Sequence, residues 1–77
     1  KIKMTKEEEK QILVDFASRV KQRRESLDIS QEKLAGIAGL HRTYIGSLER
    51  AEKIPSLITI VKITKALQIN ISDLIII

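Results

Sequence analysis

The sequence predicts an all-α domain of five helices, and three observations support this fold class. Apolar residues recur at the three- and four-residue spacing of a helix face along most of the chain. The apolar 43% of the chain is dominated by Ile and Leu, with 3% aromatic residues and few Gly or Pro. Two short amphipathic segments lie within Gln31–Arg50 and flank Gly39. A chain of 77 residues has room for one core, so we expect a single domain over residues 1–77.

The first helix is predicted from about Lys6 to Ser26. Thr5 can cap its start, and the glutamates at positions 7–9 place negative charge where the helix dipole favours it. Its inner face is a continuous apolar stripe formed by Ile12, Leu13, Phe16, Ala17 and Val20. The same spacing leads on to Arg24, which needs an acidic partner because an unpaired buried charge is costly. The neighbouring basic residues are expected in solvent: Arg19, Lys21 and Arg23.

The second and third predicted helices lie on either side of Gly39. In the second, Leu34, Ile37 and Ala38 share one face, and Ser30 can cap the start. Gly39 can adopt the positive φ that a tight turn between two helices requires. The pattern therefore predicts two packed helices joined by a short turn.

The third predicted helix starts near Arg42 and turns Ile45 and Leu48 inward. Its other side carries no acid and consists of Arg42, Thr43, Gly46, Ser47 and Arg50. Two helices joined by a short glycine-containing turn form a helix-turn-helix, whose second helix enters the DNA major groove. This polar face is suited to phosphates and base edges, so DNA reading is favoured over a helical hairpin used only for packing.

The run from Ser30 to Arg50, with the loop to Leu57, resembles the phage-repressor-like (Cro/C1, XRE) helix-turn-helix family of DNA-binding domains. The segment L-H-R-T-Y-I at residues 40–45, continuing as L-E-R at 48–50, is most similar to the controller proteins of restriction–modification systems. The resemblance covers residues 16–75 and implies a five-helix, lambda-repressor-like domain. It also implies an ion pair between the first and third helices, which Arg24 and Glu49 match. Where the family often has glycine, this chain has Asp28 and Gln68, and we expect a less regular turn at Gln68.

The third helix is expected to read the bases. Arg42 would make a bidentate contact to guanine, and Thr43 and Ser47 would contact neighbouring base edges. By resemblance, the amide of Gln31 would donate to a DNA phosphate. The other expected backbone contacts are His41, Tyr44, Arg50 and Lys53.

Three residues of this region keep two interpretations each. His41, the only histidine, would cap the helix start or contact a phosphate. Tyr44 would either pack its ring against the core or reach a phosphate with its hydroxyl. Gly46 is expected on the exposed face, where the backbone could come close to DNA, or it is a neutral substitution.

The fourth helix is predicted to start with Ser56 as its cap. Its inner face, against the first helix, is expected to consist of Leu57, Ile60, Val61, Thr64 and Leu67. Asn70 and Asp73 resemble a capping box that opens a fifth helix. Residues 68–77 hold more apolar side chains than a one-sided helix needs, so they form the expected dimer surface, with Ile71, Leu74, Ile75, Ile76 and Ile77. The alternative is that Ile75–Ile77 complete the monomer core.

Composition narrows the functional classes. The net charge of +4 favours a polyanionic partner. Residues 1–6 carry three lysines and are expected to form a flexible terminus, with a DNA-embracing basic arm as the alternative. One histidine, no cysteine and no convergent carboxylate pair leave no catalytic or metal-binding set, so we expect no enzyme, metal or cofactor. No apolar stretch approaches the roughly 20 residues of a membrane span, and no signal peptide is visible. A cytoplasmic protein with no membrane partner and no small-molecule ligand is therefore expected.

The favoured function is a sequence-specific, homodimeric transcription regulator. Two recognition helices related by a two-fold axis would enter successive major grooves about 34 Å apart in a pseudo-palindromic operator of double-stranded DNA. By resemblance, the operator would lie upstream of a restriction–modification operon, with RNA polymerase as a further candidate partner. A phage or mobile-element repressor or antitoxin is one alternative. A helical interaction module that has lost DNA binding is another, and it predicts no salt-dependent affinity for duplex DNA.

Overall fold

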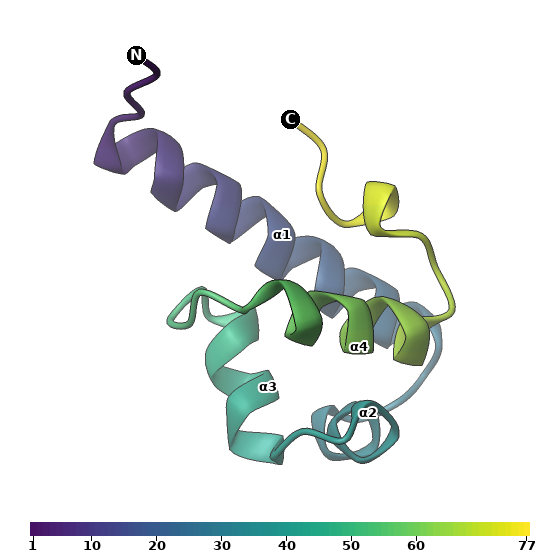
Figure 1. The fold of residues 1–77 in the computed structure, drawn as a ribbon. Helices are drawn as coiled ribbons and strands as arrows, with labels where there is room; N and C mark the ends of the chain where they lie inside the picture. Colours follow the sequence, from purple (N-terminus) through teal and green to yellow (C-terminus); the bar gives the residue numbers. More distant parts are fainter.

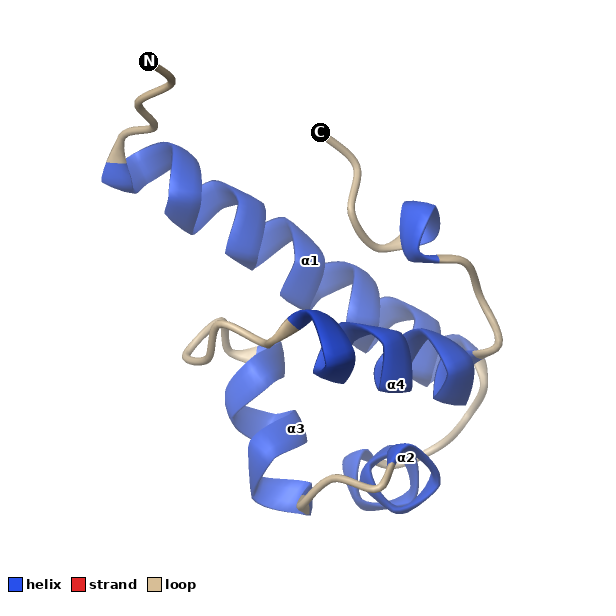
Figure 2. Ribbon diagram, in the orientation of Figure 1, coloured by secondary structure: helices blue, strands red, loops and turns tan.

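The computed structural model describes residues 1–77 as four α-helices followed by one 3-10 turn. The helices are α1 (Lys6–Ser26), α2 (Gln31–Ala38), α3 (Arg42–Glu49) and α4 (Leu57–Leu67), and the turn is η1 (Ile71–Asp73). No strand is present, so the all-α prediction is confirmed (Figure 2). The predicted fifth helix is wrong, because the seven residues after Asn70 form only this single turn. So short a segment does not offset the cost of helix nucleation.

The long helix α1 forms one side of the molecule, and the three shorter helices gather against its C-terminal half (Figure 1). Helix α2 packs against both α3 and α4, and α1 contacts α3. The inner face of α4 was expected to lie against the first helix, but α4 packs mainly on α2. The C-terminal tail turns back and runs toward the N-terminal half of α1 (Figure 1).

One core joins all these elements. Its buried members are Phe16, Val20, Leu34, Ala35, Ala38, Ile45, Leu48, Ile63, Ala66, Leu67 and Leu74. Leu74 is only 1% exposed, so its assignment to a dimer surface is wrong. Its side chain fills the core of its own chain, because the 3-10 turn points it inward, and Ile75 packs beside it. Ile71, Ile76 and Ile77 remain exposed.

The buried faces of α2 and α4 differ in part from the predicted ones. Ile37 is 52% exposed, because the small residues Ala35 and Ala38 form the face on which α2 meets its neighbours. On α4, Leu57 and Val61 point outward, whereas the deeply buried residues are Ile63, Thr64, Ala66 and Leu67. Helix α4 is apolar almost all round, so its periodicity alone does not select the inner face.

Side chains fix the start of every α-helix. The Thr5 hydroxyl accepts from the backbone N–H of Glu8 at 3.1 Å. The Glu8 carboxylate in turn accepts from the backbone N–H of Thr5 at 2.9 Å, which completes a capping box. The hydroxyls of Ser30 and Ser56 likewise accept from the backbone N–H of Lys33 and of Thr59, and so cap α2 and α4. The predicted caps at these three positions are confirmed.

Each α-helix also ends in the same way, with a residue in the left-handed conformation: Asp28 (φ 56°), Gly39 (φ 71°), Ala51 (φ 60°) and Gln68 (φ 58°). At Gln68 the two hydrogen bonds that close a helix end are both present, at 3.2 Å to Lys65 and at 3.1 Å from Ile69 to Thr64. The turn is therefore regular, and the expected irregularity there is wrong. The left-handed conformation at Gln68 is strained, and the packing of the next residue, Ile69, against the core offsets that strain.

The C-terminal end of α4 is tied to α1 by Arg23. Its Nε donates to the backbone oxygen of Leu67 at 3.1 Å and satisfies one of the carbonyls left free at the helix end. Arg23 was expected in solvent, and this contact corrects that expectation. No helix of the structure is both long enough and apolar enough to span a membrane.

Candidate nucleic-acid interface

Helices α2 and α3 form a tight pair around Gly39. Leu40 N–H donates to the backbone oxygen of Ala35 at 2.8 Å, which closes the turn. His41 then caps α3, since its Nδ1 accepts from the backbone N–H of Thr43 at 3.2 Å. The capping alternative for His41 is thus present in the structure. Because Nδ1 faces the helix, Nε2 is the ring nitrogen left for an outside partner.

Behind this pair, a hydrogen-bonded ion pair connects α1 with α3. Arg24 donates from Nε to Glu49 Oε2 at 2.7 Å and from Nη2 to Glu49 Oε1 at 3.0 Å. The side chains of Arg24 and Glu49 are 11% and 2% exposed. The hydrogen bond to Glu49 raises the pKa of the Arg24 guanidinium, although desolvation opposes this. The two residues that the resemblance pairs therefore fix the C-terminal ends of α1 and α3 against each other.

Gln31 belongs to the same network. Its Nε2 donates to Glu49 Oε1 at 3.0 Å, and its side chain is half-buried. The amide nitrogen carries a second N–H, which remains for a phosphate. The start of α2 is thus held at a fixed distance from the C-terminal end of α3.

The outer side of the pair is a shallow polar hollow of about 410 Å³ between the start of α2 and the exposed side of α3. It contains no apolar residue and is lined by Gln31, Glu32, Arg42, Thr43, Gly46, Ser47 and Arg50. Arg42 and Thr43 are exposed, and Ser47 is half-buried. The body of the protein leaves this surface open, so the three residues expected to read bases share one accessible face.

Gly46 lies differently from the expected exposed position. It is buried, because the side chains of Gln31 and Arg50 lie over it. A Cβ at Gly46 would meet Arg50 Nη1 at 3.3 Å and Gln31 Oε1 at 3.4 Å. The glycine therefore makes room for two neighbouring side chains at the floor of the hollow.

The remaining residues expected to contact the DNA backbone lie around this hollow. Tyr44 is half-buried with its ring against the core, in line with the packing interpretation. Arg50 is exposed and donates from Nε to Glu52 at 3.1 Å. This hydrogen bond raises the pKa of Arg50 and lowers the pKa of the Glu52 carboxyl. Lys53 is exposed beyond the C-terminal end of α3.

One contact in the hollow was missed from the sequence. Arg42 Nη1 donates to Glu32 Oε2 at 3.3 Å, so a carboxylate from α2 stands beside a recognition face that has no acid of its own. The two residues are ten positions apart, and only the crossing of α2 and α3 brings them together. No group of three or more His, Cys, Asp or Glu side chains that could hold a metal ion occurs in the structure.

Two short helices packed around a glycine turn, with the polar side of the second left open, define a helix-turn-helix DNA-binding domain. The comparison with known families agrees, since the helix-turn-helix family matches residues 20–74. The chain belongs to this family, and it is a DNA-binding transcription regulator.

Several relatives within the family are control proteins. The control protein C.SmaI of Serratia marcescens is 46% identical over 59 residues, which cover 77% of this chain and 70% of that protein. The crystal structure of the restriction–modification controller protein C.AhdI from Aeromonas hydrophila is similar with a TM-score of 0.79 and 40% identity, over 80% of this chain and 94% of that one. The P22 c2 repressor, solved in complex with a synthetic operator, has a TM-score of 0.75 and 30% identity, over 79% of this chain and 92% of that one.

Proposed function

We propose that this protein is the controller of a restriction–modification system and binds its operator as a homodimer. The observation that carries the proposal is the open polar face of α3, on a domain similar to C.SmaI and C.AhdI over more than three quarters of its length. A face of this kind offers donors to base edges and phosphates at the same time.

Direct readout is assigned to the exposed side of α3. Arg42 stands at the N-terminal end of the helix, which is the end that enters the major groove in this class of domain. Its guanidinium would donate to O6 and N7 of a guanine, and Thr43 and Ser47 would contact the bases beside it.

Register on the duplex would come from phosphate contacts around the hollow. The remaining N–H of Gln31 and the cationic heads of Arg50 and Lys53 surround α3 at the positions where two backbones would pass. His41 Nε2 would add a contact at the N-terminal end of the helix, and the Tyr44 hydroxyl is a further candidate.

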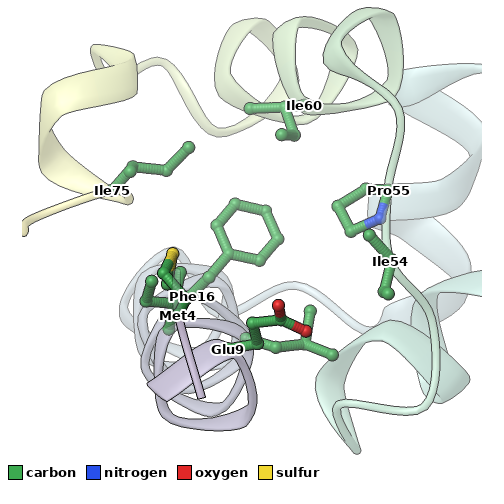
Figure 3. A pocket seen from close by; sticks show the side chains of 9 residues that line it. Met4, Glu9, Phe16, Ile54, Pro55, Ile60 and Ile75 are labelled. Carbon is green, nitrogen blue, oxygen red and sulfur yellow. The ribbon is translucent and has the colours of Figure 1, made fainter. Parts of the chain in front are cut away.

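The second copy would cover apolar surface that one chain leaves exposed. Ile54, Leu57, Ile58, Ile76 and Ile77 are all more than half exposed. Between the N-terminal half of α1 and the tail lies an apolar groove of about 350 Å³, whose lining includes Phe16, Ile54, Ile60 and Ile75 (Figure 3). A chain this small gains burial by pairing, and a two-fold axis would set the recognition helices about 34 Å apart. The dimer surface proposed here therefore joins the outer side of α4 to Ile71, Ile76 and Ile77, without Leu74.

Selection from random duplexes tests the whole proposal. The protein is mixed with a random DNA library, the retained fragments are sequenced, and their affinity is measured at several salt concentrations. We expect a pseudo-palindromic site with half-sites about one helical turn apart, and an affinity that falls steeply with salt. If the retained fragments share no common sequence, or if salt does not affect their retention, the regulator assignment would be wrong and a helical interaction module would be favoured.

The likeness to the P22 c2 repressor favours a second candidate, a phage or mobile-element repressor of the same fold. The selected site separates the two, because a controller site would lie before restriction and modification genes in the source genome. A reporter driven by that upstream region, with and without the protein, would also show whether RNA polymerase is recruited or blocked.

A further inference from the structure

The polar hollow contains one acid among its DNA-facing residues. Glu32, in the first turn of α2, is 74% exposed at its side chain and stands beside Arg42, whose side chain is 68% exposed. A carboxylate on a surface that approaches phosphates opposes binding by charge. The contact of Glu32 with Arg42 suggests why an acid lies on this surface.

The geometry of the contact leaves the reading edge of Arg42 free. Only Nη1 of Arg42 donates to Glu32, whereas Nε and Nη2 have no partner in the structure. The two parallel N–H bonds of that edge are the ones that suit a bidentate contact with guanine. Arg42 can therefore hold Glu32 with one side of its guanidinium and contact a base with the other.

Arg50 provides the contrasting case on the same helix face. Its Nε donates to Glu52 at 3.1 Å and its Nη2 donates to Ser47 at 3.4 Å, so the corresponding edge is already occupied. Of the two arginines that border the hollow, only Arg42 keeps this edge available. The acid beside Arg42 thus restrains the side chain without blocking it.

We propose that Glu32 is a positioning residue that sets the base preference of Arg42. It holds the guanidinium over the hollow and competes with DNA phosphates, which would otherwise draw the flexible arginine to the backbone. On duplexes without the correct guanine, a phosphate contact by Arg42 would bring the phosphate close to the Glu32 carboxylate, whose like charge repels it, so these duplexes bind less well. On the correct site the contact with Glu32 and the contact with guanine coexist. The inference rests on the proposed DNA-binding function and assigns its specificity.

The variant Glu32→Gln removes the charge and keeps the size of the side chain. Its affinity is measured on the selected duplex, on the same duplex with the contacted guanine replaced, and on an unrelated duplex. We expect the unrelated and substituted duplexes to bind about two- to fivefold more tightly, with the selected duplex changed less than twofold. Discrimination between the selected and unrelated duplexes therefore falls. Glu32→Ala, which also removes the acceptor, should act in the same direction.

The matched control is Glu52→Gln, which removes an exposed acid near the same surface but leaves Arg42 untouched. This variant should strengthen binding to all three duplexes by a similar factor and leave the discrimination between them unchanged. In an Arg42→Ala background, Glu32→Gln should no longer alter discrimination. The proposal is overturned if Glu32→Gln strengthens binding to every duplex equally, as the control does. It is also overturned if Glu32→Gln still changes discrimination in the absence of Arg42. Failure of the parent protein to bind any duplex would instead overturn the proposed function.

Discussion

Two of the arginine–glutamate pairs, Arg24–Glu49 and Arg42–Glu32, have the same chemistry and opposite surroundings. Arg24 and Glu49 meet at 2.7 Å with almost no exposure, and each finds further hydrogen bonds, to Ile29 and Gln31. Arg42 and Glu32 meet at 3.3 Å with most of both side chains in water. The buried pair fixes how the helices cross, because breaking it strands a charge. The exposed pair contributes little to stability, so the DNA contact that we propose for Arg42 would not weaken the fold.

The buried side of this contrast is tested most strongly at Glu49. Glu49→Ala leaves the Arg24 guanidinium unpaired and removes an acceptor from Gln31, so we expect the free energy of unfolding to fall by about 3–5 kcal/mol. Urea unfolding followed by circular dichroism measures the loss. Glu32→Ala is the control and should change stability by less than about 0.5 kcal/mol.

The double variant Arg24→Met with Glu49→Leu separates charge from packing at the same place. Replacing a buried ion pair by apolar residues is often neutral, so most of the stability lost in Glu49→Ala should return. If the double variant is as unstable as Glu49→Ala, the network acts through its hydrogen bonds to Ile29 and Gln31 more than through the unpaired charge.

The exposed side of the contrast is tested at Arg42. Arg42→Ala should weaken binding to the selected duplex by about 1–3 kcal/mol and relax the preference at one guanine, because a bidentate contact is lost. Titration of labelled duplexes that differ at single positions measures both effects. Thermal unfolding should be unchanged within the error of the measurement, since the side chain is in water. Equal weakening on every duplex would assign Arg42 to the phosphates.

The sequence predicted the contacts that a residue type requires and missed the exposed contact that none requires. The helix caps Thr5, Ser30 and Ser56 were predictable, because a hydroxyl just before a helical pattern can accept from the free backbone N–H groups of the first turn. The apolar stripe showed that Arg24 needs an acidic partner, and the family resemblance pointed to Glu49. The exposed contact between Glu32 and Arg42 carries no such demand, so nothing in the sequence pointed to it.

Faces and helix ends were harder to predict for a different reason. Helix α4 offers apolar residues on every side, so whether Val61 or Ile63 faces inward is decided by the packing of α2. Ala51 adopts a left-handed conformation that alanine disfavours, and only the geometry of the loop imposes it. Leu74 was assigned to the dimer surface because the sequence of an apolar tail does not show whether its side chains pack into the core of their own chain or against a second copy.

Ala51 offers a test of opposite sign, two residues beyond the buried pair. Ala51→Gly removes the strain of the left-handed conformation at the end of α3, and the gain exceeds the added flexibility of the unfolded chain. We expect the free energy of unfolding to rise by about 0.5–1 kcal/mol. The control Ala35→Gly, within α2 and 2% exposed, should instead lower stability by about 1 kcal/mol. A loss of stability in Ala51→Gly would show that the methyl group is needed in the loop.

The smallest effect is expected at Lys53, which extends the contrast to the surface beyond α3. An exposed lysine that pairs with a phosphate acts as a point charge, so Lys53→Ala should weaken all duplexes alike and leave discrimination intact. The slope of log K against log salt should flatten by about 0.9, the counterion release of one phosphate contact. Lys65→Ala changes an exposed lysine on α4 that does not line the polar hollow, so it is the matched control and should leave the slope unchanged. Equal flattening by both variants would mean that the slope reports net charge, and Lys53 would then have no place among the phosphate contacts.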